Sequence, residues 1–305
     1  MLELDIVDAH HHLWDLSRSY PWLQEPAGRL KVHGEDTAIR RDYLLGDFLR
    51  EAEPLRPVAS VHVDAGAGDP LEEARWLQDL ADDSGFPQGI VAGVRLDADD
   101  VGDALDSLAA LPNVRGVRHI LNWHADPALT YTDRPDLMSD PAWLVGYARL
   151  ADHGLSFDLQ VYPHQLAEAA ELAAAHPDTP VILDHAGMPT ERDDETLAAW
   201  RSGLATLAAQ PNTTVKISGI GMTDHRWTLD SLRPIVLDTI EAFGPDRAMF
   251  ASNFPVDSLY STYAQLYGAF DTLTADFSPD ERSALFSGTA QRVYRLDLPT
   301  APSTP

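Results

Sequence analysis

Three consecutive histidines lie near the start of the chain, and two of them are spaced so that they can act together. The apolar segment 4–7 is followed by Asp8 and then by the run His10-His11-His12. If this stretch is a β-strand, alternation places Asp8, His10 and His12 on one face and His11 on the other. Neutral imidazole is the commonest metal ligand in proteins and also binds oxyanions. The run is too short for a purification tag, so the spacing of His10 and His12 predicts a site for a divalent metal ion or an oxyanion.

The composition excludes several other kinds of site and partner. The 305 residues carry a formal net charge of -26 at pH 7, which argues against nucleic acid or an anionic membrane as a partner because both would be repelled. The chain has no cysteine, so any metal must be held by His, Asp, Glu, Lys or water. The N-terminus lacks the basic and long apolar regions of a secretory signal, and no run reaches membrane-spanning length. We therefore expect a cytoplasmic protein that acts on a small molecule, as a monomer or a homodimer.

A regular alternation of strand-like and helix-like segments begins at residue 57. Together with the opening segment, short β-branched runs predict about eight strands, the later ones at 58–63, 89–95, 114–120, 156–162, 181–185, 214–218 and 248–252. Apolar residues at helical spacing predict helices between them, at 70–82, 100–111, 141–153, 165–176, 195–210 and 231–243. This pattern predicts a single-domain (β/α)8 TIM-type barrel over residues 1–297, with a flexible tail at 298–305. A doubly wound open sheet is the alternative, but no Gly-rich dinucleotide fingerprint follows an early strand.

A long connection at 13–45 separates the first strand from the next expected helix. Connections of this length in compact domains are usually functional, for example as lids. Its aromatic side chains, Trp14 among them, could cap a substrate pocket or pack against the barrel, and the sequence does not separate these roles.

Polar residues end most of the predicted strands. In a TIM barrel the catalytic groups lie at the C-terminal ends of the strands. The residues at those positions are His10, His12, Arg118, His119, Tyr162, His164, His185, Ser218 and Asn253. A single histidine at a strand end is more often structural, but several from distant parts of the chain predict a common site.

Four motifs, taken in order, resemble the amidohydrolase superfamily. They are Asp8-Ala9-His10-His11-His12-Leu13-Trp14-Asp15, Gly116-Val117-Arg118-His119, Leu183-Asp184-His185-Ala186-Gly187 and Met249-Phe250-Ala251-Ser252-Asn253-Phe254-Pro255. From residue 6 to about 295 the chain is similar to the branch of sugar-lactone and 2-pyrone-4,6-dicarboxylate lactonases. The resemblance implies a barrel hydrolase whose site uses the first-strand histidine pair, the sixth-strand histidine and the eighth-strand acid. Several members of this branch hydrolyse lactones without a tightly bound metal, so the resemblance leaves metal dependence open.

The eighth strand departs from the family pattern. The family usually has Ser-Asp-Trp-Pro where this chain has Ser252-Asn253-Phe254-Pro255. An amide cannot act as a general base near neutral pH, although it can form hydrogen bonds or weakly ligate a metal. Either another group is the base, or a metal-bound water needs little help, or the protein is a binding relative that has lost catalysis. We favour the first two explanations together because the histidine set is complete.

The predicted reaction is attack of water on the carbonyl carbon of a lactone. His10, His12 and His185 are the candidate ligands of a divalent metal, with Zn²⁺ as the first choice, and Asn253 completes the catalytic set. Without a metal, the same imidazoles would stabilise the oxyanion. His164 is the candidate general base, since its unperturbed pKa lies near working pH, and a helix-start role after Pro163 is the alternative.

Arg118, Tyr162 and Trp14 are the candidate substrate-binding residues. The planar guanidinium of Arg118 matches a carboxylate, although it could equally form a salt bridge at the barrel end. Lys216 shares a strand face with Ser218, and a charged lysine inside the barrel needs a carboxylate partner or a substrate, of which we favour a buried carboxylate. Two further functions stay open, a metal-dependent decarboxylase of the same superfamily and a catalytically degenerate barrel that binds a metabolite.

Overall fold

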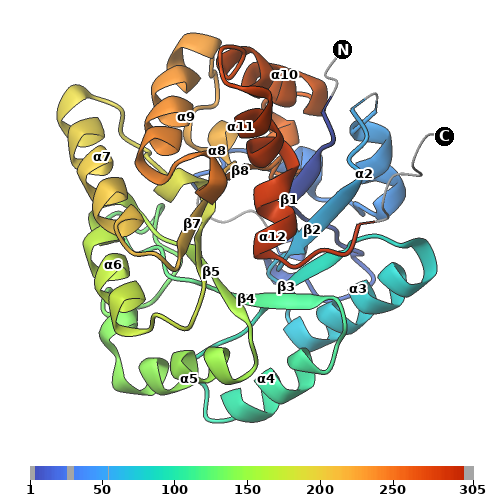
Figure 1. Cartoon of the computed structure of the whole chain (residues 1–305). Helices are drawn as coiled ribbons and strands as arrows, with labels where there is room; N and C mark the ends of the chain where they lie inside the picture. The colour runs from blue at the N-terminus through green and yellow to red at the C-terminus, as the bar shows by residue number, and fades with distance from the viewer. Residues whose placement is uncertain (1–3, 26–30, 54, 299–305) are drawn as a thin grey trace.

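The computed structural model of the chain describes residues 4–25, 31–53 and 55–298, and its central feature is a barrel of eight parallel strands (Figure 1). The strands are hydrogen-bonded in chain order: β1 (Val7–His11), β2 (Ala59–Val63), β3 (Gly89–Gly93), β4 (Val114–Ile120), β5 (Ser156–Gln160), β6 (Val181–Leu183), β7 (Thr213–Ile217) and β8 (Ala248–Phe250). The chain closes the barrel just beyond β8, where the Asn253 N–H donates to His10 O and the His12 N–H donates to Phe254 O, both at 2.7 Å. The predicted (β/α)8 barrel is thus confirmed, and the open-sheet alternative is wrong.

Helices surround the barrel in the crossovers between strands (Figure 1). The principal ones are α3 (Pro70–Ser84), α4 (Val101–Ala109), α5 (Pro141–Asp152), α6 (Leu166–Ala175), α7 (Asp194–Ala208), α9 (Leu229–Phe243) and α10 (Tyr263–Leu273). Proline at the first helical position and a capping aspartate define the starts of α3 and α5. The shorter helices are α1 (Pro21–Gln24), α2 (Leu45–Glu51), α8 (Ile220–Thr223), α11 (Pro279–Ser283) and α12 (Thr289–Val293).

The strands end earlier than the sequence predicts. β3, β5, β6 and β8 each stop two residues before the predicted end. At the sixth and eighth positions the backbone turns sharply after the strand, with φ of 55° at His185 and 57° at Asn253. The predicted strands therefore included residues that belong to the first turn of the βα connections.

A β-bulge in β1 changes which of its side chains enter the barrel. The pairing of β1 with β2 shifts register between Asp8 and His11. Asp8 accepts a hydrogen bond from the hydroxyl of Tyr263 in α10 (3.2 Å), and the ring of His11 stacks on Phe48 in α2 at 4.1 Å. The prediction that Asp8 shares a face with His10 and His12 is wrong, because the bulge turns Asp8 and His11 outward together.

The long connection at 13–45 contains α1 and a 3-10 turn at Thr37–Ile39, and its residues 26–30 lie outside the described residues. All of the expected tail except Leu298 also lies outside them. Within the part of the chain that the structure describes, no helix combines the length and apolar character needed to cross a membrane.

Candidate active site

Three buried histidines meet at the C-terminal end of the barrel. His10 is the penultimate residue of β1, His12 directly follows that strand, and His185 follows β6. The centroid of the His10 ring is 5.0 Å from that of His12 and 4.6 Å from that of His185. The structure thus brings together the three histidines that were predicted as metal ligands.

In each of these three histidines, the Nδ1 atom contacts another group of the protein. His12 Nδ1 lies 2.7 Å from Val63 O, and because a carbonyl only accepts, this nitrogen carries the proton. His10 Nδ1 lies 3.3 Å from Asp184 Oδ1, and His185 Nδ1 lies 2.9 Å from Ser218 Oγ. Histidines that bind metals are held in this way, with the second ring nitrogen donating to a carboxylate, carbonyl or hydroxyl. The Nε2 atoms are then left for a ligand, and that of His10 is buried without a hydrogen-bond partner among the residues that the structure describes.

Asn253 presents an oxygen to this histidine cluster. Its Oδ1 atom lies 3.3 Å from His12 Nε2. Since the proton of His12 is on Nδ1, two lone pairs face each other across this distance, an arrangement that a cation between them would stabilise. Two ligands of a tetrahedral zinc ion are about 3.3 to 3.5 Å apart, which agrees with the observed separation.

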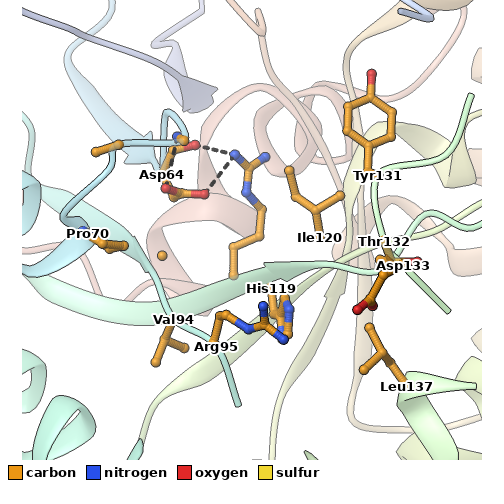
Figure 2. Close-up of a pocket in the computed structure, with 14 residues that line it drawn as sticks. Asp64, Pro70, Val94, Arg95, His119, Ile120, Tyr131, Thr132, Asp133 and Leu137 are labelled. Atoms are coloured by element: carbon orange, nitrogen blue, oxygen red, sulfur yellow. Dashed lines mark hydrogen bonds and ion pairs between the residues drawn. The ribbon is translucent and has the colours of Figure 1, made fainter. Parts of the chain in front are cut away.

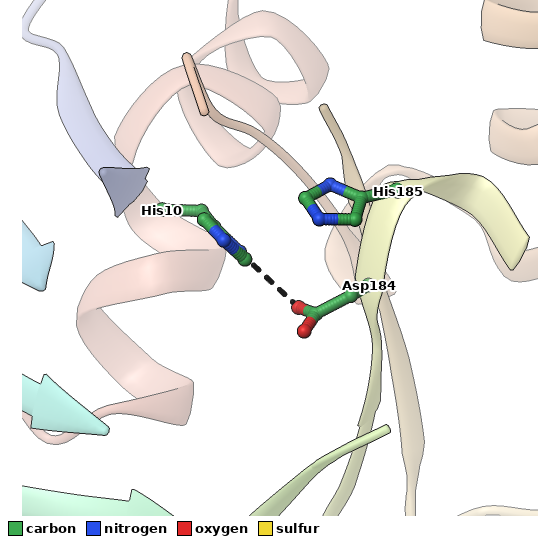
Figure 3. A group of neighbouring side chains, drawn as sticks. All are labelled: His10, Asp184 and His185. Carbon is green, nitrogen blue, oxygen red and sulfur yellow. Dashed lines mark ion pairs between the residues drawn. The ribbon is translucent and has the colours of Figure 1, made fainter. Parts of the chain in front are cut away.

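A buried ionic network supports His10 from inside the barrel, and Figure 3 shows one of its contacts, between His10 and Asp184. Lys216 Nζ is completely buried and lies 3.2 Å from Asp184 Oδ1 and 3.3 Å from His10 Nδ1. Lys216 also donates to Asp158 Oδ2, which accepts a second hydrogen bond from the Tyr294 hydroxyl at 2.8 Å. The expectation that Lys216 needs a buried carboxylate partner is confirmed, and it has two.

Asp184 is close enough to the histidines to be considered a metal ligand itself. One carboxylate oxygen of Asp184 and one ring nitrogen each of His10 and His185 lie within 4.8 Å of one another. However, Asp184 Oδ1 is within 3.3 Å of both Lys216 Nζ and His10 Nδ1. Asp184 thus lies where it can orient His10, and it is also a candidate metal ligand beside the histidines.

Burial keeps the cluster histidines in their neutral, metal-binding form. It is the largest cause that lowers the pKa of His10 and His12 well below 6.5, and the next are the charges of Lys216 for His10 and Arg118 for His12. Burial likewise lowers the pKa of His185 to about 4. Near pH 7 all three imidazoles therefore have a lone pair available.

The backbone at two of these residues adopts a conformation that non-glycine residues rarely have. His185 and Asn253 have positive φ, as do Ala186 and Met188 beside His185. Such residues cost of the order of 1–3 kcal/mol each and concentrate at functional sites. Gly219 shows the tightness of packing here, because a Cβ atom at that position would lie 2.5 Å from His185 Nδ1.

A cavity of about 270 Å³ opens onto His12, His185 and Asn253. Apolar side chains form much of its wall, with Arg118 and Gln160 as polar groups from neighbouring strands. An adjoining cavity of about 460 Å³ lies over the ends of β2 to β4 (Figure 2) and shares Asp64, Gly66, Arg118, Ile120 and Tyr131 with the first.

Arg118 lies at the junction of the two cavities. Its Nη1 donates to Gln160 Oε1 at 3.1 Å, and its Nη2 lies 3.3 Å from Asp64 Oδ2. Within the described parts of the chain, its buried Nε has no hydrogen-bond partner. Arg118 thus forms the salt bridge foreseen as an alternative while still lining the cavity.

The other predicted site residues lie outside the 270 Å³ cavity. Among the described residues, Trp14, Tyr162 and His164 do not line it. Trp14 is fully buried and donates from Nε1 to Arg41 O, and Tyr162 donates its hydroxyl proton to Leu129 O. His164 is exposed, with its ring 6.0 Å from that of His124.

Several cavity or site residues are absent from the sequence prediction. Lys31 and His33 line the cavity from the long connection, and Asp64 and Gln160 line it from β2 and β5. Asp257 lies behind Asn253, whose Nδ2 donates to Asp257 Oδ1 at 3.3 Å, and burial raises the pKa of this acid to about 7. The position of Asp64 directly after a predicted strand was a signal that could have identified it, whereas nothing in the sequence distinguishes Asp257.

The chain belongs to the amidohydrolase family, since the family profile described as Amidohydrolase matches residues 7–296. The protein y4mH of Sinorhizobium fredii is 45% identical over 299 residues, which are 97% of this chain and 100% of that protein. L-fucono-1,5-lactonase of Burkholderia multivorans is 32% identical over 96% of this chain and 97% of its own length. A crystal structure of an amidohydrolase from Burkholderia multivorans with bound zinc matches with a TM-score of 0.81 at 29% identity, over 96% of this chain and 100% of that one.

Proposed function

We propose that this protein is a lactonase that opens the cyclic ester of a small sugar acid or of an intermediate of aromatic breakdown. The observation that carries the proposal is the set of three histidines, each held through Nδ1, beside a cavity of small-molecule size. The similarity to a protein named L-fucono-1,5-lactonase over nearly the whole chain supports a lactone as the substrate.

The residues fit a divalent metal, and we propose Zn²⁺. His10, His12 and His185 would supply nitrogen ligands and Asn253 an amide oxygen, a donor set that suits zinc. The lone pairs of His12 Nε2 and Asn253 Oδ1, facing each other at 3.3 Å, support this assignment. When bound, zinc lowers the pKa of water and polarises a carbonyl group.

Residues of this chain would bind and orient the substrate. Arg118 lies at the junction of the two cavities, where its guanidinium can bind the ring oxygens or a carboxylate of the substrate. Trp22, Ile120 and Met222 provide apolar surface against one side of a ring. The cavity of about 270 Å³ lies just below the range of about 300–1,000 Å³ typical of drug-sized ligands, which favours a small substrate.

Two cavity-lining groups can accept the proton of the attacking water. Asp64 is a carboxylate at the end of β2, and His33 has its Nε2 atom 3.4 Å from Asp36 Oδ2, which leaves Nδ1 as the basic nitrogen. Asn253 cannot be the general base, because an amide does not accept a proton near neutral pH. Asp64 and His33 lie on the cavity, whereas the predicted base His164 is exposed outside it.

Proton release from a panel of sugar lactones, muconolactones and pyrone carboxylates tests the proposal. We expect release with at least one lactone, its loss on treatment with a chelator, and its recovery with added Zn²⁺. Absence of release across the panel from zinc-loaded protein would contradict the proposal. Release of CO₂ from an aromatic acid would instead identify a decarboxylase.

We propose further that the protein is cytoplasmic and acts as a monomer or homodimer on a small molecule, without nucleic acid or membrane as a partner. The net charge of -26 supports the exclusion of polyanions. Cell fractionation tests the location, and light scattering of the purified protein tests the oligomeric state.

A further inference from the structure

We infer that Asp257 is a positioning residue that orients the Asn253 amide so that its oxygen faces the histidine cluster. The inference rests on the proposed function in one respect, because it concerns the same metal site. It assigns a role to a residue that neither forms the wall of the cavity nor belongs to the histidine cluster.

The Asp257 carboxylate is buried, with 1% of its surface exposed, and both of its oxygens accept hydrogen bonds. Oδ2 accepts from the backbone N–H of Gly221 at 3.2 Å, and Oδ1 accepts from Asn253 Nδ2 at 3.3 Å. Both oxygens therefore act as acceptors, and the two N–H groups hold the carboxyl group in one orientation.

The backbone fixes Asp257 in this position. The Asp257 N–H donates to Asn253 O at 3.1 Å, which closes a turn between the two residues. On the other side the packing is tight, since a Cβ atom on Gly221 would lie 3.3 Å from Asp257 Cγ. The carboxylate therefore has little freedom to move away from the amide.

This contact decides which end of the Asn253 amide faces the histidines. With Nδ2 donating to Asp257, Oδ1 is directed to His12 Nε2. The reverse orientation would place Oδ1 against a carboxylate oxygen, which only accepts hydrogen bonds. Asp257 thus holds the amide so that an oxygen, the atom a metal can bind, is presented to the cluster.

Zinc affinity of the full chain, measured by chelator competition with the zinc ion alone, tests this role. Asp257→Asn keeps an oxygen that can accept from Gly221 but replaces the acceptor that faces Asn253 by a donor. We expect it to weaken zinc binding by about 10- to 100-fold, the usual effect of losing a group that holds a metal ligand. The double variant Asn253→Asp, Asp257→Asn has a carboxylate at position 253, both ends of which are oxygens that need no orienting partner, and it should recover zinc affinity to within a fewfold of the original protein.

A matched control is Asp140→Asn, which alters a capping aspartate that accepts from Ala142 N and Trp143 N at the start of α5. We expect its zinc affinity to be unchanged. The melting temperature of each metal-free variant establishes that it folds. If Asp257 only stabilised the start of α8, the double variant would bind zinc no better than Asp257→Asn.

The inference is overturned if Asp257→Asn binds zinc as well as the original protein, if the double variant shows no recovery, or if the original protein does not bind zinc. Lactone hydrolysis by the original protein is measured in parallel. Hydrolysis without zinc binding would overturn this inference and leave the lactonase proposal standing. The expected pattern of zinc affinities without hydrolysis of any lactone would support the inference and overturn the proposed function.

Discussion

Replacing Lys216 by methionine should destabilise the protein by about 3–5 kcal/mol at slightly alkaline pH, the usual cost of removing one partner from a buried ionic group. Lys216, Asp158 and Asp184 have no exposed side-chain surface. The contact of 3.2 Å between Lys216 Nζ and Asp184 Oδ1 corresponds to an attraction of about 5 kcal/mol at an effective dielectric constant of about 20. Methionine fills a similar volume but leaves two buried carboxylates without a cation.

The loss should depend on pH. Burial raises the pKa of Asp158 from 3.8 to about 6, and Lys216 acts in the opposite direction. Because the folded pKa is above the unfolded one, the contribution of Asp158 to stability is complete below pH 3.8 and is lost as pH rises through about 6. Without Lys216 the folded pKa rises further, so the variant loses more than the original protein as pH increases. The difference should be small near pH 4 and should increase as the pH rises through about 6 and beyond.

Urea unfolding at about pH 5 and pH 8 measures the difference in the free energy of unfolding between the variant and the original protein. With about 2.1 cal/mol/K of unfolding entropy per residue, a loss of 3–5 kcal/mol corresponds to a decrease in melting temperature of roughly 5–8 °C. The matched control is Arg50→Met, because Arg50 pairs with Asp47 on the surface with 67% of its side chain exposed, and such pairs contribute about 0–1 kcal/mol. A loss below about 1 kcal/mol at pH 8, or a loss that is the same at both pH values, would refute the reasoning.

Three further predictions concern activity. His10→Ala and His185→Ala should each abolish lactone hydrolysis and zinc retention without preventing folding; near-normal turnover in both would exclude the histidine site. Arg118→Lys keeps the charge but loses the planar fork, so KM should rise about tenfold for lactones that bear a carboxylate and change little for neutral ones; equal effects on both would exclude an anchoring role. His33→Ala should reduce kcat by about 100-fold or more if its Nδ1 accepts the proton, whereas His164→Ala should have little effect, and the opposite result would favour the exposed His164 as the base.

The periodicity of the sequence was sufficient to predict the barrel and much of its site. Alternating strand-like and helix-like segments predicted eight βα units, and the polar residues that follow the strands included His10, His12, His185, Arg118 and Asn253. This succeeded because parallel strands in a closed barrel all end on the same side, so that position along each strand is also position relative to the site.

A position shortly after a strand did not by itself identify a site residue. Trp14, Tyr162 and His164 follow strands in the sequence, but the direction of each loop carries their side chains away from the 270 Å³ cavity. Lys31 and His33 reach this cavity from the middle of a long connection. Local propensity does not specify the path of such a connection, because its path depends on packing against the other loops.

The residue types of this site, its strand framework and its lack of thiolate ligands follow from the amino-acid sequence alone. The bulge that turns Asp8 outward while His10 and His12 point inward is seen only in the folded chain, because a register shift depends on how β1 pairs with β2. The contact of Asp257, one of 48 acidic residues, with the Asn253 amide likewise arises only on folding. Neither outcome follows from periodicity, since each depends on contacts between segments that fold against one another.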